Sequence, residues 1–125
     1  MSKYKVVAAA LVLGLFLLCP ARASALSEVE AGRVEGLLAA LGEAGSLEFI
    51  RNGKAYSASR AVSHLRSKLN RVKDRLSTAE EFVDKVASGS SMSGDPYLVR
   101  FADGREITAG EYFHDLLKGG SPGGD

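Results

Sequence analysis

The sequence predicts a small single-domain α+β protein with about four helices and two β-hairpins, preceded by an export signal. Three observations lead to this prediction. Apolar residues recur at helical spacing in several segments. Two pairs of short strand-like segments flank glycine-containing turns. About 100 of the 125 residues follow an apolar leader, which is enough for one domain with a modest core.

The first 25 residues have the parts of a cleavable secretory signal peptide. Lys3 and Lys5 give a positive start, Val6–Leu18 is an uncharged apolar run, and small residues lead up to Ala25. We therefore expect signal peptidase to cleave between Ala25 and Leu26, and the mature protein to act outside the cytoplasm.

Two alternatives would keep the protein attached to a membrane. The apolar run has about 13 residues, whereas a helix needs about 20 to span a bilayer, and Pro20 breaks the run. Cys19, the only cysteine, could carry a lipid, but a lipoprotein signal calls for a small residue where Leu18 stands. We expect instead a soluble mature domain without cysteine, which excludes disulfides, thiol nucleophiles and thiolate metal sites.

Removal of the leader reverses the sign of the net charge. The full chain has 16 basic and 15 acidic residues, a net charge of +1. Loss of Lys3, Lys5 and Arg22 leaves 13 basic residues against the same 15 acidic ones, a net charge of −2. This balance argues against a nucleic-acid partner.

The mature chain opens with a predicted helix and a hairpin. Residues 27–41 carry apolar side chains at helical spacing, and Gly42 and Gly45 are expected to end this helix. The next segments are predicted strands, residues 47–51 and 54–57. They flank Asn52-Gly53, the dipeptide that most readily adopts the two left-handed residues of a tight turn. A two-residue turn places Phe49 opposite Tyr56.

Two further helices are predicted in the middle of the chain. Ser57 can cap a helix over residues 58–76, which has the clearest helical period of the sequence. Ser77-Thr78-Ala79-Glu80 then has the form of a capping box, in which two side chains satisfy free amide hydrogens at a helix start. The helix that follows is expected to bury Ala79, Phe82, Val83 and Val86.

The remaining part of the domain is predicted as a loop, a hairpin and a short helix. Ser88–Pro96 is rich in serine and glycine and reads as a loop. Tyr97–Phe101 and Arg105–Ile107 form the second hairpin if Gly104 is left-handed. This register gathers on one face Tyr97, Val99, Phe101 and Ile107. Thr108-Ala109-Gly110-Glu111 is a second capping box and starts the last helix.

Four segments occur in a fixed order and together resemble a known family. They are Phe49-Ile50-Arg51-Asn52-Gly53, His64-Leu65-Arg66-x-Lys68, Thr78-Ala79-Glu80-Glu81-Phe82, and Ser90-Ser91-Met92-Ser93-Gly94-x-Pro96-Tyr97-Leu98-Val99-Arg100. The chain resembles the YfeK-like family of small bacterial periplasmic proteins, a domain of unknown function. The resemblance covers nearly the whole mature chain and implies a Gram-negative periplasmic setting and a single α+β domain. It carries over no activity, cofactor or site residue.

A basic stripe on the second helix is the first candidate for function. Its members recur at spacings of four, four, three and four: Arg60, His64, Lys68, Arg71 and Arg75. At about 100° per residue they lie on one flank of the apolar face. The stripe is either a solvated face that packs near the acidic first helix or a docking surface for an anionic envelope component or protein. Unpaired cations converging on a groove would favour docking, and close carboxylates from Glu28, Glu30 or Glu35 would favour the solvated face.

The Ser88–Pro96 loop is the second candidate, and it is our first choice. Hydroxyls and amide hydrogens bent around glycines can line an anion or peptide site, although the same residues are ordinary turn material. The candidate binding residues of the whole chain are therefore Ser90, Ser91, Ser93, Gly94, Tyr97, His64, Lys68 and Arg71.

Catalytic and metal signatures are weak. A small hydrolase would need Ser91 or Ser93 as nucleophile with His64 or His114 as base, and an acid such as Asp95 to orient the base. The mature chain has no Gly-x-Ser-x-Gly elbow, no Ser-x-x-Lys pair and no nucleotide-binding glycine motif. Two distant histidines and no mature cysteine give no metal signature. We therefore assign no catalytic residue, metal or cofactor.

These observations predict an exported periplasmic protein with one domain over residues 26–118 and a flexible tail over residues 119–125. The expected function is a non-catalytic binding or accessory module of the cell envelope that contacts an envelope protein or an anionic envelope component. The alternatives are a small periplasmic serine hydrolase and a structural or stress protein without a small-molecule ligand.

Overall fold

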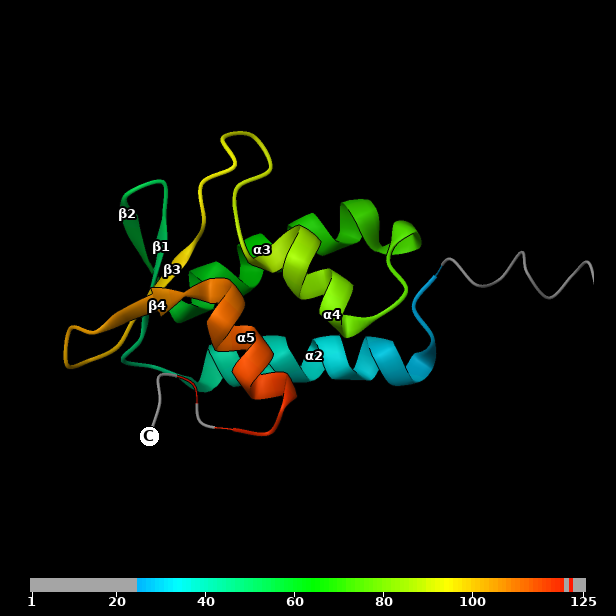
Figure 1. Cartoon of the computed structure of the whole chain (residues 1–125), viewed down its shortest axis with the longest axis horizontal. Helices are drawn as coiled ribbons and strands as arrows, with labels where there is room; N and C mark the ends of the chain where they lie inside the picture. The colour runs from blue at the N-terminus through cyan, green and yellow to red at the C-terminus, as the bar shows by residue number, and fades with distance from the viewer. Residues whose placement is uncertain (1–24, 121, 123–125) are drawn as a thin grey trace, which may run out of the picture.

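The structure is a computed structural model that describes residues 25–120 and residue 122. The predicted signal peptide lies outside the described residues, except for Ala25 at its end. Leu26, on the other side of the expected cleavage point, packs against the hydrophobic core. Helices make up one side of the molecule and a small sheet the other, with a long loop projecting beside the sheet (Figure 1).

The first helix, α2 (Glu28–Glu43), is capped by the Ser27 hydroxyl, which accepts a hydrogen bond from the Glu30 amide at 3.2 Å. It continues beyond Gly42 and ends at Glu43, before Gly45, so the predicted limit at residue 41 was wrong by two residues. A Cβ at Gly42 would lie 3.6 Å from the Val62 side chain of the next helix. Gly42 therefore stays packed on the neighbouring helix, and this packing outweighs the weak helix propensity of glycine.

The first hairpin forms as predicted. Strands β1 (Glu48–Arg51) and β2 (Lys54–Ser57) pair antiparallel, with Phe49 opposite Tyr56. Asn52 and Gly53 have φ angles of 51° and 79°, the left-handed conformations of a two-residue turn. Side chains two residues apart in a strand share a face. Arg51 therefore emerges on the same inner face as Phe49.

The second helix, α3 (Ala58–Val72), begins at Ser57, whose hydroxyl accepts from the Arg60 amide at 3.3 Å. It ends earlier than the predicted limit at residue 76, because Lys73–Arg75 form a 3-10 turn. This turn leads into Leu76, which has an extended backbone and a side chain that is 1% exposed. Burial of Leu76 in the core is thus achieved by redirecting the chain and not by one more turn of helix.

The third helix, α4 (Ala79–Phe82), runs on as a π-helical turn, Val83–Ala87. Its cap is Thr78, whose hydroxyl accepts from the Glu81 amide at 3.1 Å, so the predicted capping box was wrong by one residue. The Glu81 carboxylate accepts from the Ser77 amide at 2.6 Å. All four side chains expected in the core from this helix are buried: Ala79, Phe82, Val83 and Val86.

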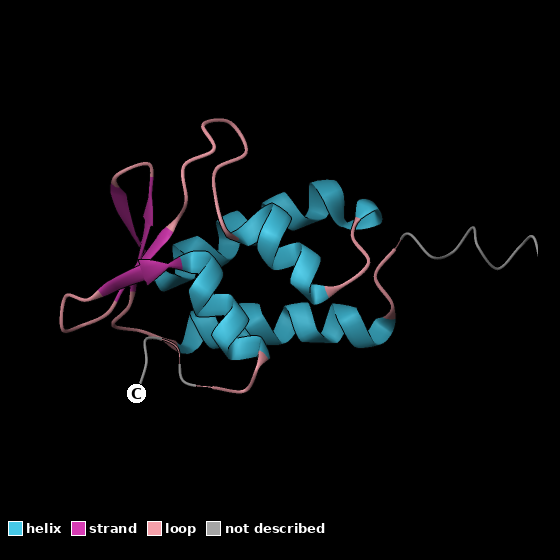
Figure 2. Ribbon diagram, in the orientation of Figure 1, coloured by secondary structure: helices cyan, strands magenta, loops and turns pink. Residues whose placement is uncertain are grey.

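The second hairpin joins the first in one four-stranded antiparallel sheet of order β2-β1-β3-β4 (Figure 2). Its strands are β3 (Leu98–Arg100) and β4 (Glu106–Thr108), with Val99 opposite Ile107 as predicted. Gly104 has the expected left-handed backbone, with φ of 93°. The pairing of β1 with β3 was not predicted, and it makes each hairpin one half of the sheet.

The last helix, α5 (Ala109–Leu117), is capped by Thr108, whose hydroxyl accepts from the Glu111 amide at 3.1 Å. The amides of Gly119 and Gly120 donate to carbonyls in its last turn at 3.0 Å, so these two residues of the predicted tail close the helix. The other described tail residue is Pro122, and residues 121 and 123–125 lie outside the description.

The core fills the space between the inner face of the sheet and the four helices. Helix α2 contacts α3, α4 and α5, while α3 contacts β1 and α5 contacts β3. The largest fully buried side chains are aromatic or aliphatic. Tyr97 is one of them, and it carries a polar hydroxyl. Among the described residues, no helix has the length and apolar character needed to cross a bilayer.

Candidate functional site

The projecting loop and the basic helix face, which the sequence treated as separate candidates, line one cavity. We call it the cationic cleft, and it has a volume of about 220 Å³. Seven of the eight predicted binding residues line it: His64, Lys68, Arg71, Ser90, Ser91, Ser93 and Tyr97. Gly94, the eighth, is not in the lining. It turns the loop with a left-handed φ of 80°.

Lys68 forms the buried floor of the cleft. Its side chain is only 7% exposed, and its ammonium donates to the carbonyls of Val86 and Gly89 at 2.9 Å and to the Tyr97 hydroxyl at 3.0 Å. Three donors thus meet three acceptors, so the charge is satisfied without a carboxylate. Val86 lies at the end of the third helix, where carbonyls lack helical partners and carry partial negative charge.

The hydrogen bonds of Lys68 set the proton positions of its neighbours. Since the Tyr97 hydroxyl accepts from the ammonium, its own proton is free to point toward His64 Nε2, 3.1 Å away. With the Tyr97 proton in this direction, Nε2 accepts and the neutral imidazole carries its proton on Nδ1. Burial, together with the positive charges of Arg51, Lys68 and Arg71, holds the pKa of His64 below its usual value. A chain of three side chains therefore runs from the floor to the wall of the cleft.

Positive charge is concentrated at the cleft. Burial and then the charges of Arg51 and Arg71 lower the pKa of the Lys68 ammonium. Among the described residues, no aspartate or glutamate lines the cleft. The guanidinium groups of Arg51 and Arg71 have no carboxylate partner there, although Arg51 lies over the Tyr56 ring at 5.1 Å.

Four other arginines of the described chain are paired with acids, whereas Arg60 and Arg75 have no carboxylate partner among the described residues. The four that pair with carboxylates at 2.8–2.9 Å are Arg33, Arg66, Arg100 and Arg105. Glu30 and Glu35, which could have covered the basic stripe, bind Arg33 and Arg66 instead. This arrangement meets one criterion for docking: Lys68 and Arg71 of the stripe line a cavity without a carboxylate partner.

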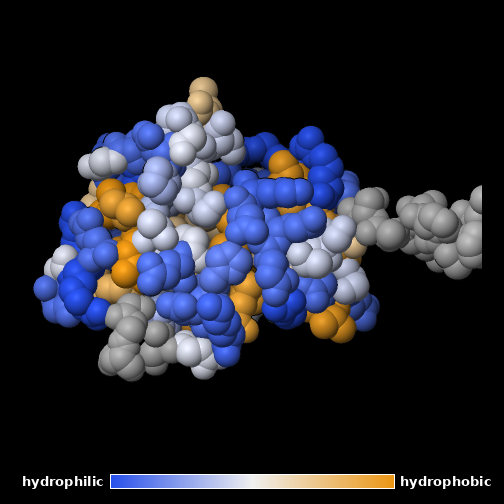
Figure 3. Space-filling view, viewed as in Figure 1, coloured by the Kyte–Doolittle hydropathy of each residue, from blue (hydrophilic) through white to orange (hydrophobic). Residues whose placement is uncertain are grey.

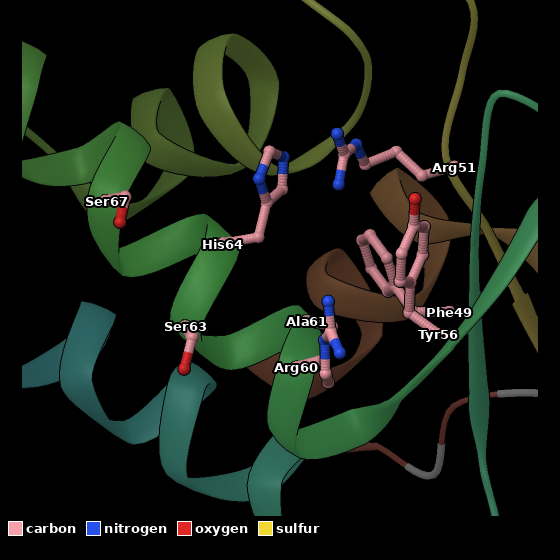
Figure 4. A pocket seen from close by; sticks show the side chains of 8 residues that line it. All are labelled: Phe49, Arg51, Tyr56, Arg60, Ala61, Ser63, His64 and Ser67. Atoms are coloured by element: carbon pink, nitrogen blue, oxygen red, sulfur yellow. The ribbon is translucent and has the colours of Figure 1, made fainter.

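A second pocket adjoins the cleft and shares Arg51 and His64 with it. We call it the aromatic pocket, and it has a volume of about 290 Å³. Its other lining residues are Phe49, Tyr56, Arg60, Ala61, Ser63 and Ser67. Figure 4 shows the Arg51 and His64 side chains pointing toward one another, from strand β1 and helix α3. These two side chains form the boundary between the two cavities.

The serine-glycine loop uses most of its amide hydrogens internally. The amides of Met92 and Ser93 donate to the Ser90 hydroxyl at 3.3 Å, and the Gly94 amide donates to the Ser90 carbonyl at 2.9 Å. The Ser93 hydroxyl donates to the Asn52 side chain at 3.2 Å, which ties the loop to the first hairpin. The loop therefore offers the cleft its side chains more than its backbone.

Ser91 and Met92 line the cleft and are also exposed to solvent. Ser91 is exposed, and its hydroxyl has no hydrogen-bond partner within residues 25–120. Met92 is 97% exposed at the projecting loop. Figure 3 shows a face on which hydrophilic residues predominate and hydrophobic ones form separate small groups. Apolar surface on this face is therefore local and does not form a continuous band.

The structure does not assemble the serine hydrolase arrangement within the described residues. His64 is bonded to Tyr97, and His114 lies 2.9 Å from Asp84, away from the cleft. Ser93 donates to Asn52 and not to an imidazole. A nucleophile needs a base within hydrogen-bond reach, and neither candidate serine is bonded to one here.

Sequence reasoning missed Arg51 and Asn52, which complete the cleft, and Tyr56, which forms a wall of the aromatic pocket. The sequence did contain a signal that places Arg51 at the site. The predicted hairpin register places it on the face of Phe49, toward the helix that carries the basic stripe. The proximity of the loop to this hairpin had no local signal, because it depends on the pairing of β1 with β3.

The comparisons with known proteins point to a family and give no activity. A model described as "Family of unknown function (DUF5329)" matches residues 28–120. The chain is 48% identical over 86 residues to "Uncharacterized protein YfeK" of Salmonella typhimurium, an alignment that covers 69% of this chain and 71% of that protein. No solved structure matches the chain significantly.

Proposed function

The chain belongs to DUF5329, a family of unknown function, and it is similar to an uncharacterised YfeK protein. We therefore propose its function from the geometry of its own candidate site. The protein is a non-catalytic binding module of the cell envelope, and it holds an anionic partner in the cationic cleft. The observation that carries this proposal is the set of cations without a carboxylate partner, Arg51, Lys68 and Arg71, around a cavity that no described aspartate or glutamate lines.

The repulsion between the cations of the cleft is the physical argument for a bound anion. Like charges brought together near a buried ammonium repel one another more strongly than they would in water. Lys68 is fully hydrogen-bonded, so its role is to fix the loop and to supply a constant positive field. An anion in the cleft would offset this repulsion, and Arg51 and Arg71 would contact it directly.

The periplasmic location is part of the same proposal. It is supported by the amino-terminal positive residues, the short apolar run and the small residues before Leu26. Mass spectrometry of the protein purified from a Gram-negative periplasmic extract should give a chain that begins at Leu26. A chain that still begins at Met1, or one with a lipid on Cys19, would contradict this location and the free domain that it implies.

A capture experiment tests the binding role. Immobilised mature protein is exposed to envelope extract, and bound material is compared between the wild type, the double variant Arg51→Gln/Arg71→Gln and the control Arg66→Gln. Arg66 lies on the same helix as Arg71, but its guanidinium pairs with Glu35. We expect the double variant to lose a partner that the wild type and the control retain, and moderate salt to weaken capture. Equal capture by all three proteins would overturn the proposal.

A further inference from the structure

The two adjoining cavities suggest what kind of anion the cleft holds. The cationic cleft and the aromatic pocket share Arg51 and His64, so a ligand in one is in contact with the wall of the other. Within the described residues, neither cavity is lined by an aspartate or glutamate. The aromatic pocket adds the Phe49 and Tyr56 rings to these cations, so a ligand that fills both cavities would present an anionic end to the cleft and a ring to the pocket.

The cleft suits a group with two charges and several acceptor oxygens. Arg51, Lys68 and Arg71 bring three positive charges to it, and Ser91 and His64 also line it. A carboxylate has one charge and two oxygens in a plane. A phosphate monoester has up to two charges near neutral pH and three terminal oxygens, which can accept from donors on different walls.

The aromatic pocket suits a compact ring. Its floor is made of buried Phe49 and Ala61, its wall is the half-buried Tyr56 ring, and Ser63 and Ser67 also line it. Arg51 and Arg60 lie over the Tyr56 ring at 5.1 and 6.0 Å, which restricts where that ring can move. Figure 4 shows the Phe49 and Tyr56 rings close to the guanidinium of Arg51. In a ligand with an uncharged ring next to an anionic group, the ring would contact Phe49 and Tyr56 and the anionic group would contact Arg51.

We propose that the ligand is a phosphate monoester of a ring-bearing alcohol, with the phosphoryl group between Arg51, His64 and Arg71 and the ring in the aromatic pocket. This proposal rests on the proposed function, because it names the ligand class of the same site. The negative charge of the phosphoryl group offsets the positive charges around the cleft, which no carboxylate of the described lining neutralises. Lys68 attracts the phosphoryl group through its charge and keeps its hydrogen bonds to its three acceptors.

Titration calorimetry with three soluble probes tests the ligand class: phenyl phosphate, benzoate and inorganic phosphate. We expect phenyl phosphate to bind at least tenfold more tightly than either of the other two. Tyr56→Ala should reduce its affinity several-fold and leave inorganic phosphate unchanged. Arg71→Gln should weaken both phosphates at least fivefold, and Arg66→Gln should weaken neither. Circular dichroism establishes that each variant is folded.

Vesicles test the requirement for a ring. Phosphatidic acid in phosphatidylcholine vesicles carries a phosphate monoester without a ring. Tight binding of soluble phenyl phosphate that is lost in Arg71→Gln supports the proposal. Vesicle binding that is lost in Arg71→Gln, with phenyl phosphate bound no more tightly than inorganic phosphate, would overturn the ring assignment and leave the anion-binding function standing. Benzoate that binds as tightly as phenyl phosphate, with the same dependence on Arg71, would overturn the phosphate assignment and leave the anion-binding function standing. If no probe and no vesicle binds, or if Arg71→Gln binds as well as the wild type, both proposals are wrong.

Discussion

At the scale of single residues, Lys68 is the side chain on which the cleft depends. The helical period of α3 placed it on a basic flank of the helix, yet the structure buries it. The reason is tertiary. The end of the third helix and the neck of the loop offer two carbonyls at this point, and Tyr97 offers a hydroxyl. A residue expected to contact a partner thus holds three elements together.

Replacement of Lys68 by methionine keeps the length of the side chain and removes its charge. Two carbonyls and a hydroxyl then lose their donor, so we expect the free energy of unfolding to fall by about 2–4 kcal/mol. Lys73→Met is the matched control, because Lys73 is exposed on the 3-10 turn, and it should change stability by less than about 0.5 kcal/mol. Urea denaturation measures the free energy of unfolding of both variants. Equal effects would show that the three hydrogen bonds of Lys68 do not stabilise the fold.

His64 gives the stability a pH dependence. Its pKa is lowered by burial and by Arg51, Lys68 and Arg71, and its other titratable neighbour is Tyr97. Between this lowered pKa and the usual value of about 6.5, the unfolded chain binds more protons than the folded chain. The free energy of unfolding should therefore fall as pH drops through that window. Above the window, His64 should contribute no pH dependence.

Urea denaturation at pH 8 and pH 5 checks this expectation. The loss of stability between the two pH values should be smaller in His64→Gln than in the wild type. His114→Gln serves as the control, because His114 pairs with Asp84 away from the cleft and its replacement leaves the His64 contribution in place. Identical losses in the wild type and His64→Gln would contradict the account of the His64 environment.

At the scale of elements, local signals predicted most of the secondary structure. Asn52-Gly53 gave the turn and register of the first hairpin, and Ser57 and Thr108 gave the starts of two helices. The errors occurred where a tertiary contact decided the outcome. The amide of Ala79 is bound by Glu30 of α2 at 2.7 Å, and the helix cap lies at Thr78 and not at Ser77. No local pattern contains such a contact.

Two glycine substitutions should change stability in opposite directions. Gly53 has a left-handed φ of 79°, so Gly53→Ala should destabilise the protein by about 1–2 kcal/mol. Gly36 lies within α2, and a Cβ there would meet nothing within 4 Å, so Gly36→Ala should stabilise it by about 0.5–1 kcal/mol. Thermal denaturation measures both variants. A stabilising Gly53→Ala would contradict the turn that positions Asn52 beside the loop.

At the scale of the whole molecule, the sheet creates the site. Pairing of β1 with β3 brings the first hairpin beside the strand that follows the loop, and the Ser93–Asn52 hydrogen bond links loop and hairpin. The sequence identified the loop and the basic helix face as separate candidates. Their convergence could not be predicted, because neither strand carries a local signal for its long-range partner.

Anions should stabilise the folded protein through the cleft. A ligand that binds only the folded state adds stability, about 2.7 kcal/mol at a concentration of 100 times its dissociation constant. Phosphate at constant ionic strength should therefore raise the unfolding temperature of the wild type and Arg66→Gln more than that of Arg51→Gln/Arg71→Gln. Measuring all three in the same buffers separates site binding from the general effect of phosphate on burial. Equal increases would indicate that only the general effect acts.

The most direct test of an anion site in the cationic cleft is an amide ¹H–¹⁵N NMR titration with phenyl phosphate. The predicted result is a saturable set of shifts concentrated on Arg51, His64, Arg71 and Ser91, with little change around the ion-paired Arg33 and Arg100. Shifts that do not saturate, or that spread evenly over all basic residues, would contradict the central claim that the unpaired cations of this cleft form a binding site.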